Sequence, residues 1–225
     1  MSVTLGLGAQ SAPAYFGAKE QALGPTGSFA LNRLSFGPLS VDGGARTGFG
    51  VHGGFRYIAP RSAADYAALT GLNDVPAAVE LGGGIDYATD DYRLYADVRY
   101  GVVGHESFVA EMGGDVYYRP SDALTFSAGP RIFFGDDSYA ETYFGVTPTE
   151  SLASGGALTA FDAQGGLLST GVEGAVTYQV TDSWGVTGSV SYDQLRADAA
   201  ASPISGTDDQ FSASIMVTRT VTFGF

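Results

Sequence analysis

The stretch Phe-Ser-Ala-Ser-Ile-Met-Val-Thr-Arg-Thr-Val-Thr-Phe-Gly-Phe, residues 211–225, alternates between two kinds of side chain. Its odd positions are apolar or aromatic except for Arg219, and its even positions are mostly Ser or Thr. Successive side chains of a β-strand point to opposite faces, so the pattern predicts one strand with an apolar face and a small, polar face. Strands of globular proteins usually have about 5–6 residues, and the greater length here favours a strand that faces lipid.

Eight further segments repeat this alternation, and many of their apolar faces carry an aromatic residue at an end, where interfacial girdles lie in membrane barrels. The segments are residues 3–9, 49–57, 79–87, 92–100, 108–118, 124–134, 168–180 and 184–192. No run approaches the roughly 18 apolar residues of a membrane helix. The sequence therefore predicts an all-β fold, a closed antiparallel transmembrane β-barrel of a Gram-negative outer membrane.

The connections between these segments come in two lengths. Tight turns are expected at residues 88–91, 120–122 and 181–183, and long loops at 60–76, 135–164 and 196–209. In such barrels the short turns face the periplasm and the long loops face outward. The count is ten strands if Ser28 to Val41 is one strand. Periodicity breaks at Asn32-Arg33, and a hairpin there would force a further strand and a total of twelve; ten is the favoured number.

The chain end itself is also informative. Val221, Phe223 and Phe225 form an alternating apolar series that resembles the terminal signal read by the outer-membrane assembly machinery. We therefore expect that machinery, together with membrane lipid, to be a partner of the protein.

Composition narrows the possible functions. The chain has 225 residues, which suits a single barrel domain covering 1–225, and it contains no Cys, which excludes thiolate chemistry and disulfides. Its net charge of −13 argues against nucleic acid as a partner. No signal peptide follows Met1, and we interpret Met1 as a start codon added to a mature sequence. No cofactor is expected.

Charged residues of both signs occupy positions predicted to face the barrel interior. They are Arg56, Glu80, Asp86, Arg93, Asp97, Arg99, Glu111, Asp115, Arg119, Arg131 and Glu173. Buried charges must be paired, and the mixed signs supply partners. These residues form either a structural network that fills a narrow barrel or the lining of a selective pore. A barrel of about eight strands has room only for side chains, whereas one of about sixteen leaves a channel. A barrel of ten to twelve strands is closer to the narrow case, which favours the structural network.

The two histidines do not predict a catalytic or metal site. His52 is expected inside the barrel beside glycines, and His105 lies in a turn close to Ser107. Nearness in sequence does not make a catalytic triad. The prediction is a protein without catalytic, cofactor-binding or metal-binding residues, and a barrel hydrolase is a remote alternative.

An ordered set of short motifs resembles the MipA/OmpV family, the MltA-interacting protein and its relatives. The motifs are Leu5-Gly6-Leu7-Gly8, Pro13-Ala14-Tyr15-Phe16-Gly17, Thr142-Tyr143-Phe144-Gly145-Val146, Ser151, Ser154-Gly155, Thr181-Asp182-Ser183-Trp184, Tyr192-Asp193-Gln194-Leu195, Asp198-Ala199-Ala200-Ala201-Ser202-Pro203-Ile204 and Asp209-Gln210-Phe211. The resemblance implies an outer-membrane location. For the named member it also implies a scaffold that links a murein transglycosylase to a peptidoglycan synthase.

The most distinctive family motif lies in the longest loop. It comprises Tyr143, Phe144, Gly145, Val146, Ser154 and Gly155. This loop is either a contact for a partner or a lid folded over the barrel mouth.

The functional prediction is therefore a non-enzymatic envelope protein that scaffolds peptidoglycan-processing enzymes, with a small pore or a surface adhesin as alternatives.

Overall fold

The computed structural model describes residues 2–36, 39–42 and 47–222, and within them it contains one antiparallel sheet and four short helices. The strands are β1 (Ser2–Pro13), β2 (Gln21–Phe36), β3 (Leu39–Asp42), β4 (Gly48–Ile58), β5 (Ala78–Ala88), β6 (Tyr92–Val103), β7 (Phe108–Ser121), β8 (Leu124–Gly135), β9 (Gly166–Gln179), β10 (Trp184–Leu195) and β11 (Asp209–Thr222). The helices are η1 (Ala67–Leu69), α1 (Asp137–Phe144), α2 (Pro148–Ala153) and α3 (Ala197–Ala201). No helix in these ranges is long and apolar enough to cross a membrane.

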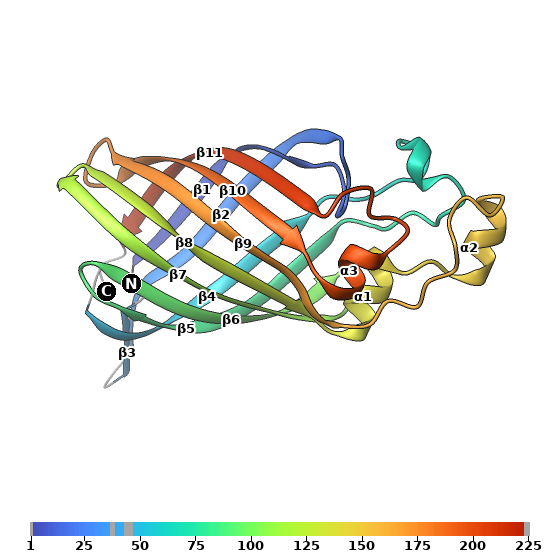
Figure 1. Ribbon diagram of the computed structural model, residues 1–225. Helices are drawn as coiled ribbons and strands as arrows, with labels where there is room; N and C mark the ends of the chain where they lie inside the picture. Colours follow the sequence, from blue (N-terminus) through green and yellow to red (C-terminus); the bar gives the residue numbers. More distant parts are fainter. Residues whose placement is uncertain (1, 37–38, 43–46, 223–225) are drawn as a thin grey trace.

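The sheet curls into the wall of a barrel (Figure 1). Its strand order is β3-β2-β1-β11-β10-β9-β8-β7-β6-β5-β4, so the first long strand pairs with the last. That pairing runs from Ser2 opposite Thr222 to Ser11 opposite Ala213. β3 and β4 stand at the two ends of this order, and β4 contacts both β3 and β2 without a hydrogen-bonded ladder among the described residues. The prediction of an all-β antiparallel barrel wall with ten long strands is confirmed.

The predicted boundaries of one strand are wrong. Ser28 to Val41 is not a single strand, because β2 starts at Gln21 and ends at Phe36, and the four-residue β3 folds back on it. Gly24, Pro25 and Gly27 obscure the alternation in the first half of β2, although this half continues the ladder with β1 as far as Pro13 opposite Gln21. A hairpin does exist, but it follows Phe36 and leaves the number of long strands at ten.

The outer face of the wall is apolar and exposed. Leu7, Leu23 and Phe49 are 78%, 86% and 87% exposed. Near the short turns the aromatic residues pair, with ring centroids 5.0 Å apart for Phe49 and Tyr87. A continuous apolar outer face of this kind is typical of a surface that faces lipid, with aromatic residues at the interface.

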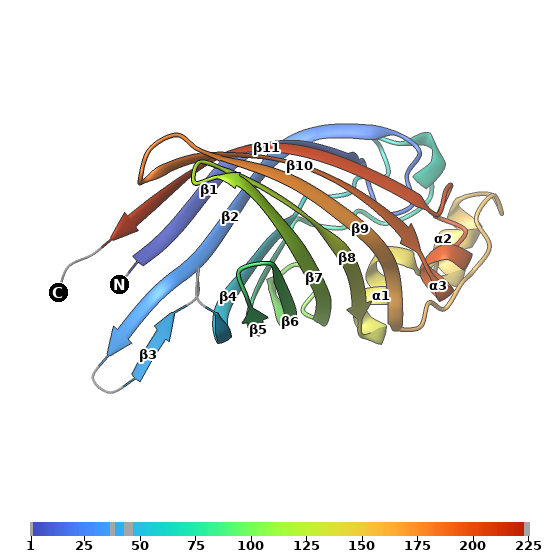
Figure 2. The same ribbon diagram turned by 60° about the vertical axis from the view of Figure 1, so that its left-hand side comes forward.

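The two ends of the barrel differ. β1 begins and β11 ends at the end of the barrel that carries the short turns, and α1, α2 and α3 lie at the opposite end (Figures 1 and 2). There the loops 14–20, 59–77, 136–165 and 196–208 pack together into a structure that we call the cap. Its interior consists of two clusters of buried side chains, one around Tyr139, Phe144 and Leu168 and the other around Tyr15, Leu69 and Ile204.

Leu168 corrects a further expectation. Alternation places it on the outer face, but it is 2% exposed and packs in the cap. The register shifts between Phe133, which pairs with Ser169, and Phe134, which pairs with Leu167. Leu168 is the extra residue of this bulge, so the side chains of β9 change face here.

Candidate functional site

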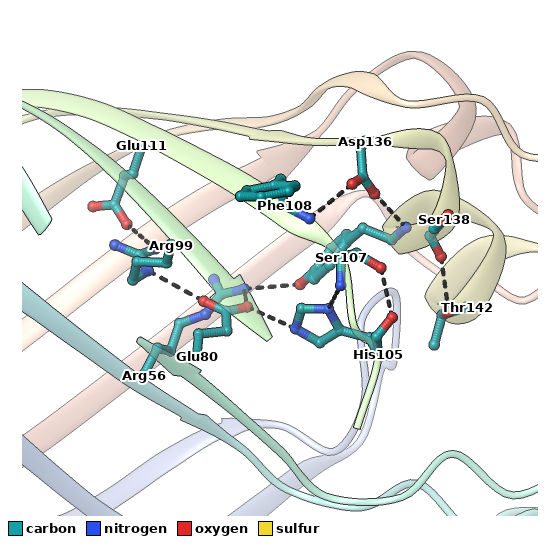
Figure 3. Close-up of polar contacts among 11 residues, drawn as sticks. Arg56, Glu80, Arg99, His105, Ser107, Phe108, Glu111, Asp136, Ser138 and Thr142 are labelled. Atoms are coloured by element: carbon teal, nitrogen blue, oxygen red, sulfur yellow. Dashed lines mark hydrogen bonds and ion pairs between the residues drawn. The ribbon is translucent and has the colours of Figure 1, made fainter. Parts of the chain in front are cut away.

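Glu80 on β5 is the centre of a buried ion cluster below the cap (Figure 3). Its side chain is fully buried. Arg56 Nη2 donates to Glu80 Oε1 at 2.6 Å, and Arg99 Nε donates to Oε2 at 3.1 Å. His105 Nε2 lies 3.2 Å from Glu80 Oε1. A carboxylate without water is tolerated only with such partners, so these contacts hold β4, β5, β6 and the 104–107 loop in one arrangement.

The hydrogen bonds of His105 define its tautomer. The backbone N–H of Ser107 donates to His105 Nδ1 at 3.2 Å, which leaves Nε2 to carry the hydrogen that is donated to Glu80. The Ser107 hydroxyl donates to the His105 carbonyl oxygen at 2.6 Å. His105 and Ser107 are therefore engaged in holding the loop and do not face each other as a nucleophile and a base.

The charge pairs continue along the interior of β4 to β9. Arg99 Nη2 donates to Glu111 at 2.9 Å, and Tyr95 donates to the same carboxylate at 2.8 Å. Arg131 Nη2 lies 2.7 Å from Asp115 and 3.1 Å from Glu173. We call the interior of β4–β8, together with Glu173, the charged wall.

His52 belongs to the same wall. Its ring nitrogens lie 3.0 Å from Asp86 and 2.5 Å from Asp97, and Arg93 Nε lies 3.6 Å from Asp86. His52 occupies an inward position of β4. The pairing of β4 with β5 and of β5 with β6 brings it beside these carboxylates. Within the described ranges no group of three or more His, Asp or Glu residues could hold a metal ion.

Ten of the eleven charged residues named from the sequence make these contacts. They are Arg56, Glu80, Asp86, Arg93, Asp97, Arg99, Glu111, Asp115, Arg131 and Glu173. Arg119 is the exception, because it is exposed at the end of β7, donates to the Asp90 carbonyl oxygen and lies 4.4 Å above the Tyr117 ring. Its strand has reached the turn there, so the prediction that Arg119 joins the network is wrong.

Apart from Glu173 and Asp193, the described interior of β1 and β9–β11 carries mainly hydroxyl groups. Thr177 and Thr187 oxygens are 3.0 Å apart, Ser189 and Ser214 oxygens 2.8 Å apart, and Thr4 and Thr220 oxygens 2.7 Å apart. We call this part the hydroxyl wall.

The cap is joined to the charged wall through Arg56. Arg56 Nη2 also donates to the hydroxyl of Tyr139, at 2.9 Å, and its guanidinium lies 4.5 Å from the centre of the Phe133 ring. Tyr139 is fully buried in α1, and burial raises the pKa of its phenol. Asp136 fixes the start of α1, because it accepts hydrogen bonds from the N–H groups of Tyr139 and Phe108. The sequence did not identify Tyr139 or Phe133 as partners of the charged residues.

The family motif in the long loop is part of the cap interior. Tyr143, Phe144 and Val146 are at most 3% exposed, and burial raises the pKa of Tyr143 to about 12. Ser202 donates to the Phe144 carbonyl oxygen at 2.5 Å. These three side chains pack inside the cap, so they are not the surface through which the loop would contact a partner; that contact stays a prediction for the loop.

The rest of the motif ends a helix and leads into a turn. Ser154 closes α2 with its hydroxyl donating to the Ser151 carbonyl oxygen at 2.7 Å, Gly145 follows α1, and Gly155 has φ 68°. Gly155 adopts the left-handed conformation that lets the chain turn back toward the barrel.

A polar contact connects two loops of the cap. The backbone N–H and side-chain amide of Asn73 both donate to Glu150 Oε1, at 2.8 and 2.9 Å. Burial acts to raise the pKa of Glu150, but hydrogen bonds from Asn73 and Thr147 outweigh it and lower the pKa below its ordinary value. Glu150 therefore contributes to the cap as a carboxylate.

The terminal series is only partly described. Val221 pairs with Val3 in the β1–β11 ladder. Phe223 and Phe225 lie outside the described residues, so their role as an assembly signal stays a prediction.

A long-stranded wall with an apolar outer face, a polar and charged inner face and a capped end defines this protein as a membrane barrel. The model of the family described as MltA-interacting protein MipA matches residues 5–221. The chain belongs to this family, and its location is the outer membrane of a Gram-negative bacterium.

A comparison with curated proteins found no match. Among solved structures the chain is similar to an outer membrane channel from Pseudomonas putida F1, with a TM-score of 0.48, 9% identity and coverage of 98% of this chain and 95% of the other. It is also similar to the NanC porin, with a TM-score of 0.39, 12% identity and coverage of 97% and 99%. Neisserial surface protein A gives a TM-score of 0.34 at 10% identity, with coverage of 99% of both chains.

Proposed function

We propose that this protein is a non-enzymatic outer-membrane scaffold, which holds a peptidoglycan-processing enzyme at its periplasmic end and does not conduct ions. The single observation that carries the proposal is the packed cap. The aromatic side chains of Tyr139, Tyr143 and Phe144 fill the space at the outer end of the barrel. An aqueous path through this end would have to cross a hydrophobic interior.

The charged wall supports the same proposal. Side chains that would attract ions in a pore are instead bound to each other, since Glu80 has Arg56, Arg99 and His105 as partners. Opening a water-filled path here would separate these pairs, which is costly when a partner stays buried. The wall acts as an internal brace for the barrel.

The family description indicates the kind of partner. The words "MltA-interacting protein" describe relatives that bind a murein transglycosylase, and the scaffold proposal extends this activity to the present chain. Such an enzyme would meet the periplasmic end, where the turns expose Asp90, Asp91, Asp122 and Asp182. This acidic rim favours a partner with a basic surface.

The absence of catalysis is part of the proposal. The His105 imidazole and the Ser107 hydroxyl are both occupied by structural hydrogen bonds. The carboxylates of the charged wall are paired with Arg or His, which leaves them poorly suited to act as a general acid or base.

A small pore is the second candidate function, and the hydroxyl wall favours it. Ser189, Ser214 and Thr187 are short side chains, so the interior on their side of the barrel is less filled than on the charged side. A pore would use this side for small polar solutes.

Two measurements on the purified, refolded protein distinguish these functions. In planar bilayers the scaffold should give no stable conductance steps, whereas Tyr139→Ala should produce openings because it removes the core of the cap. As bait in envelope extracts, the intact protein should retain a murein transglycosylase.

A rim variant tests where the partner binds. Asp90→Lys with Asp91→Lys should reduce retention of the enzyme, and Asp65→Lys, an exposed change in the cap, should not. Stable conductance by the intact protein with no murein enzyme retained would overturn the proposal.

A further inference from the structure

The outer wall of the barrel is hollowed across β7 to β11, close to the short turns. The hollow has a volume of about 730 Å³. Its floor contains four small residues on adjacent strands: Ala128, Gly174, Gly188 and Ala213. Ala128 pairs with Gly174, and Gly188 lies diagonally beside Gly174 and Ala213, which both pair with Val190. Large apolar side chains surround them: Val116, Tyr118, Phe126, Val176 and Val190.

The two glycines of the floor are not required by the packing of the protein itself. A Cβ atom added to Gly174 or to Gly188 would meet one neighbouring atom, a backbone oxygen 3.9 Å away. By contrast, a Cβ at Gly82 would collide with the Val98 carbonyl oxygen. Gly174 and Gly188 thus leave open an apolar space that a larger side chain could fill.

The hollow is continuous with the surface that faces lipid. Its rim includes Val116 and Tyr118, which are 64% and 67% exposed on the outer face of β7. Tyr118 lies next to Phe126, with ring centroids 6.1 Å apart, near the turn that joins β7 to β8. Because the short turns lie on the periplasmic side, the hollow opens into the hydrocarbon of the periplasmic leaflet.

The positively charged side chain of Arg219 lies at the periplasmic edge of the same surface. Arg219 is exposed on the outward face of β11, and its guanidinium lies 5.1 Å from the centre of the Trp184 ring. Among the described residues no carboxylate pairs with it. Gly188 lies four residues beyond Trp184 on β10, about 13 Å at a rise of 3.3 Å per residue.

We propose that a phospholipid of the periplasmic leaflet binds at this place, with an acyl chain in the hollow over Gly174 and Gly188 and its phosphate at Arg219. The chemistry of each part fits: an acyl chain gains packing contacts over the small residues, and a guanidinium forms charge-assisted hydrogen bonds with phosphate. Trp184 holds the cation at the depth of the headgroups, as interfacial aromatic residues do.

Native mass spectrometry of the detergent-purified protein, titrated with phosphatidylethanolamine, tests the proposal. The intact protein should retain one phospholipid above the non-specific background. Gly174→Leu with Gly188→Leu should abolish this species, because the leucines fill the hollow. Arg219→Gln should weaken retention roughly fivefold, as expected for the loss of one cation near a phosphate.

Two controls separate lipid binding from general damage. Ala9→Leu enlarges an exposed residue on the outer face of β1, outside the hollow, and should leave retention unchanged. Each variant should also keep the compact electrophoretic mobility of a folded barrel in cold dodecyl sulfate. Equal retention by the intact protein and the double leucine variant would overturn the proposal. The proposal would also be overturned if the intact protein were a dimer and the double leucine variant a monomer, because the hollow would then be an interface between two copies.

Discussion

The charged wall and the hydroxyl wall belong to one sheet and arise from the same alternation, but they join their strands in different ways. On the charged wall one side chain has several partners, as Arg99 does with Glu80, Asp97 and Glu111. On the hydroxyl wall each contact joins two groups on neighbouring strands, as Ser189 and Ser214 do. Long ionised side chains couple β4, β5, β6 and the cap, whereas hydroxyl groups add only local contacts to the backbone ladder. The charged side should therefore dominate the stability of the barrel and the position of the cap.

The largest expected effect is that of Glu80→Ala. This change leaves Arg56, Arg99 and His105 without their shared carboxylate in a buried place, and we expect a loss of about 3–5 kcal/mol in the free energy of unfolding. Denaturant unfolding of the protein in detergent, followed by the fluorescence of its single tryptophan, Trp184, measures this value. Glu141→Ala, an exposed carboxylate on α1, is the control. If the two variants are equally stable, the charged wall does not dominate.

The next effect concerns the attachment of the cap. Tyr139→Phe removes the hydroxyl that accepts a hydrogen bond from Arg56, and bonds to charged groups contribute about 1.5–3 kcal/mol. Hydrogen exchange of the α1 amides should become faster by a corresponding factor. Tyr143→Phe is a matched control, because the Tyr143 hydroxyl has no hydrogen-bond partner in the described part of the chain. Equal exchange in both variants would show that Arg56 does not secure the cap.

A smaller effect is expected on the hydroxyl wall. Ser189→Ala together with Ser214→Ala removes both members of a pair, so no buried polar group is left alone. The free energy of unfolding should change by less than about 1 kcal/mol. The same unfolding experiment checks it. A loss as large as that of Glu80→Ala would remove the distinction between the two walls.

The smallest effect is a pH dependence of the loop contact at Glu150. Its pKa is lowered in the folded protein, so its contribution is present above the unfolded value of about 4.3 and disappears as the pH falls through the lower, folded value. The protection of the Asn73 and Thr147 amides against hydrogen exchange, measured relative to the unfolded chain, should therefore fall below about pH 4. In Glu150→Gln this additional fall in protection should be absent. Identical profiles for the two proteins would contradict the assignment.

The strands and the charged interior were predictable because they depend on a period of two. Once Glu80 and Arg99 are placed on inward positions, neighbouring strands bring them together. The first half of β2 was not predictable, since Gly24 and Pro25 interrupt the alternation and the ladder with β1 supplies the order. The alternation predicted an inward side chain for Arg119, but this residue lies too close to the turn for its side chain to reach the interior.

The cap was the least predictable part. Its helices are short, and one sequence feature could have revealed α2: Thr147 and Glu150 form a capping box, with Pro148 at the first helical position. No local pattern indicates that Tyr139 would meet Arg56, because this contact joins residues 83 positions apart. It depends on how four loops pack.

The contacts of the 14–20 loop make the cap dependent on the completed chain. Gly17 accepts a hydrogen bond from the Gly206 N–H at 2.9 Å and donates to Gln210 at 3.0 Å, and Tyr15 packs in the same cluster as Ile204. These partners come from opposite ends of the sequence, so the loss of chain entropy on joining them is large until β1 has paired with β11. We therefore expect the cap to order late in folding, so that an ordered cap would report that the first and last strands have been joined.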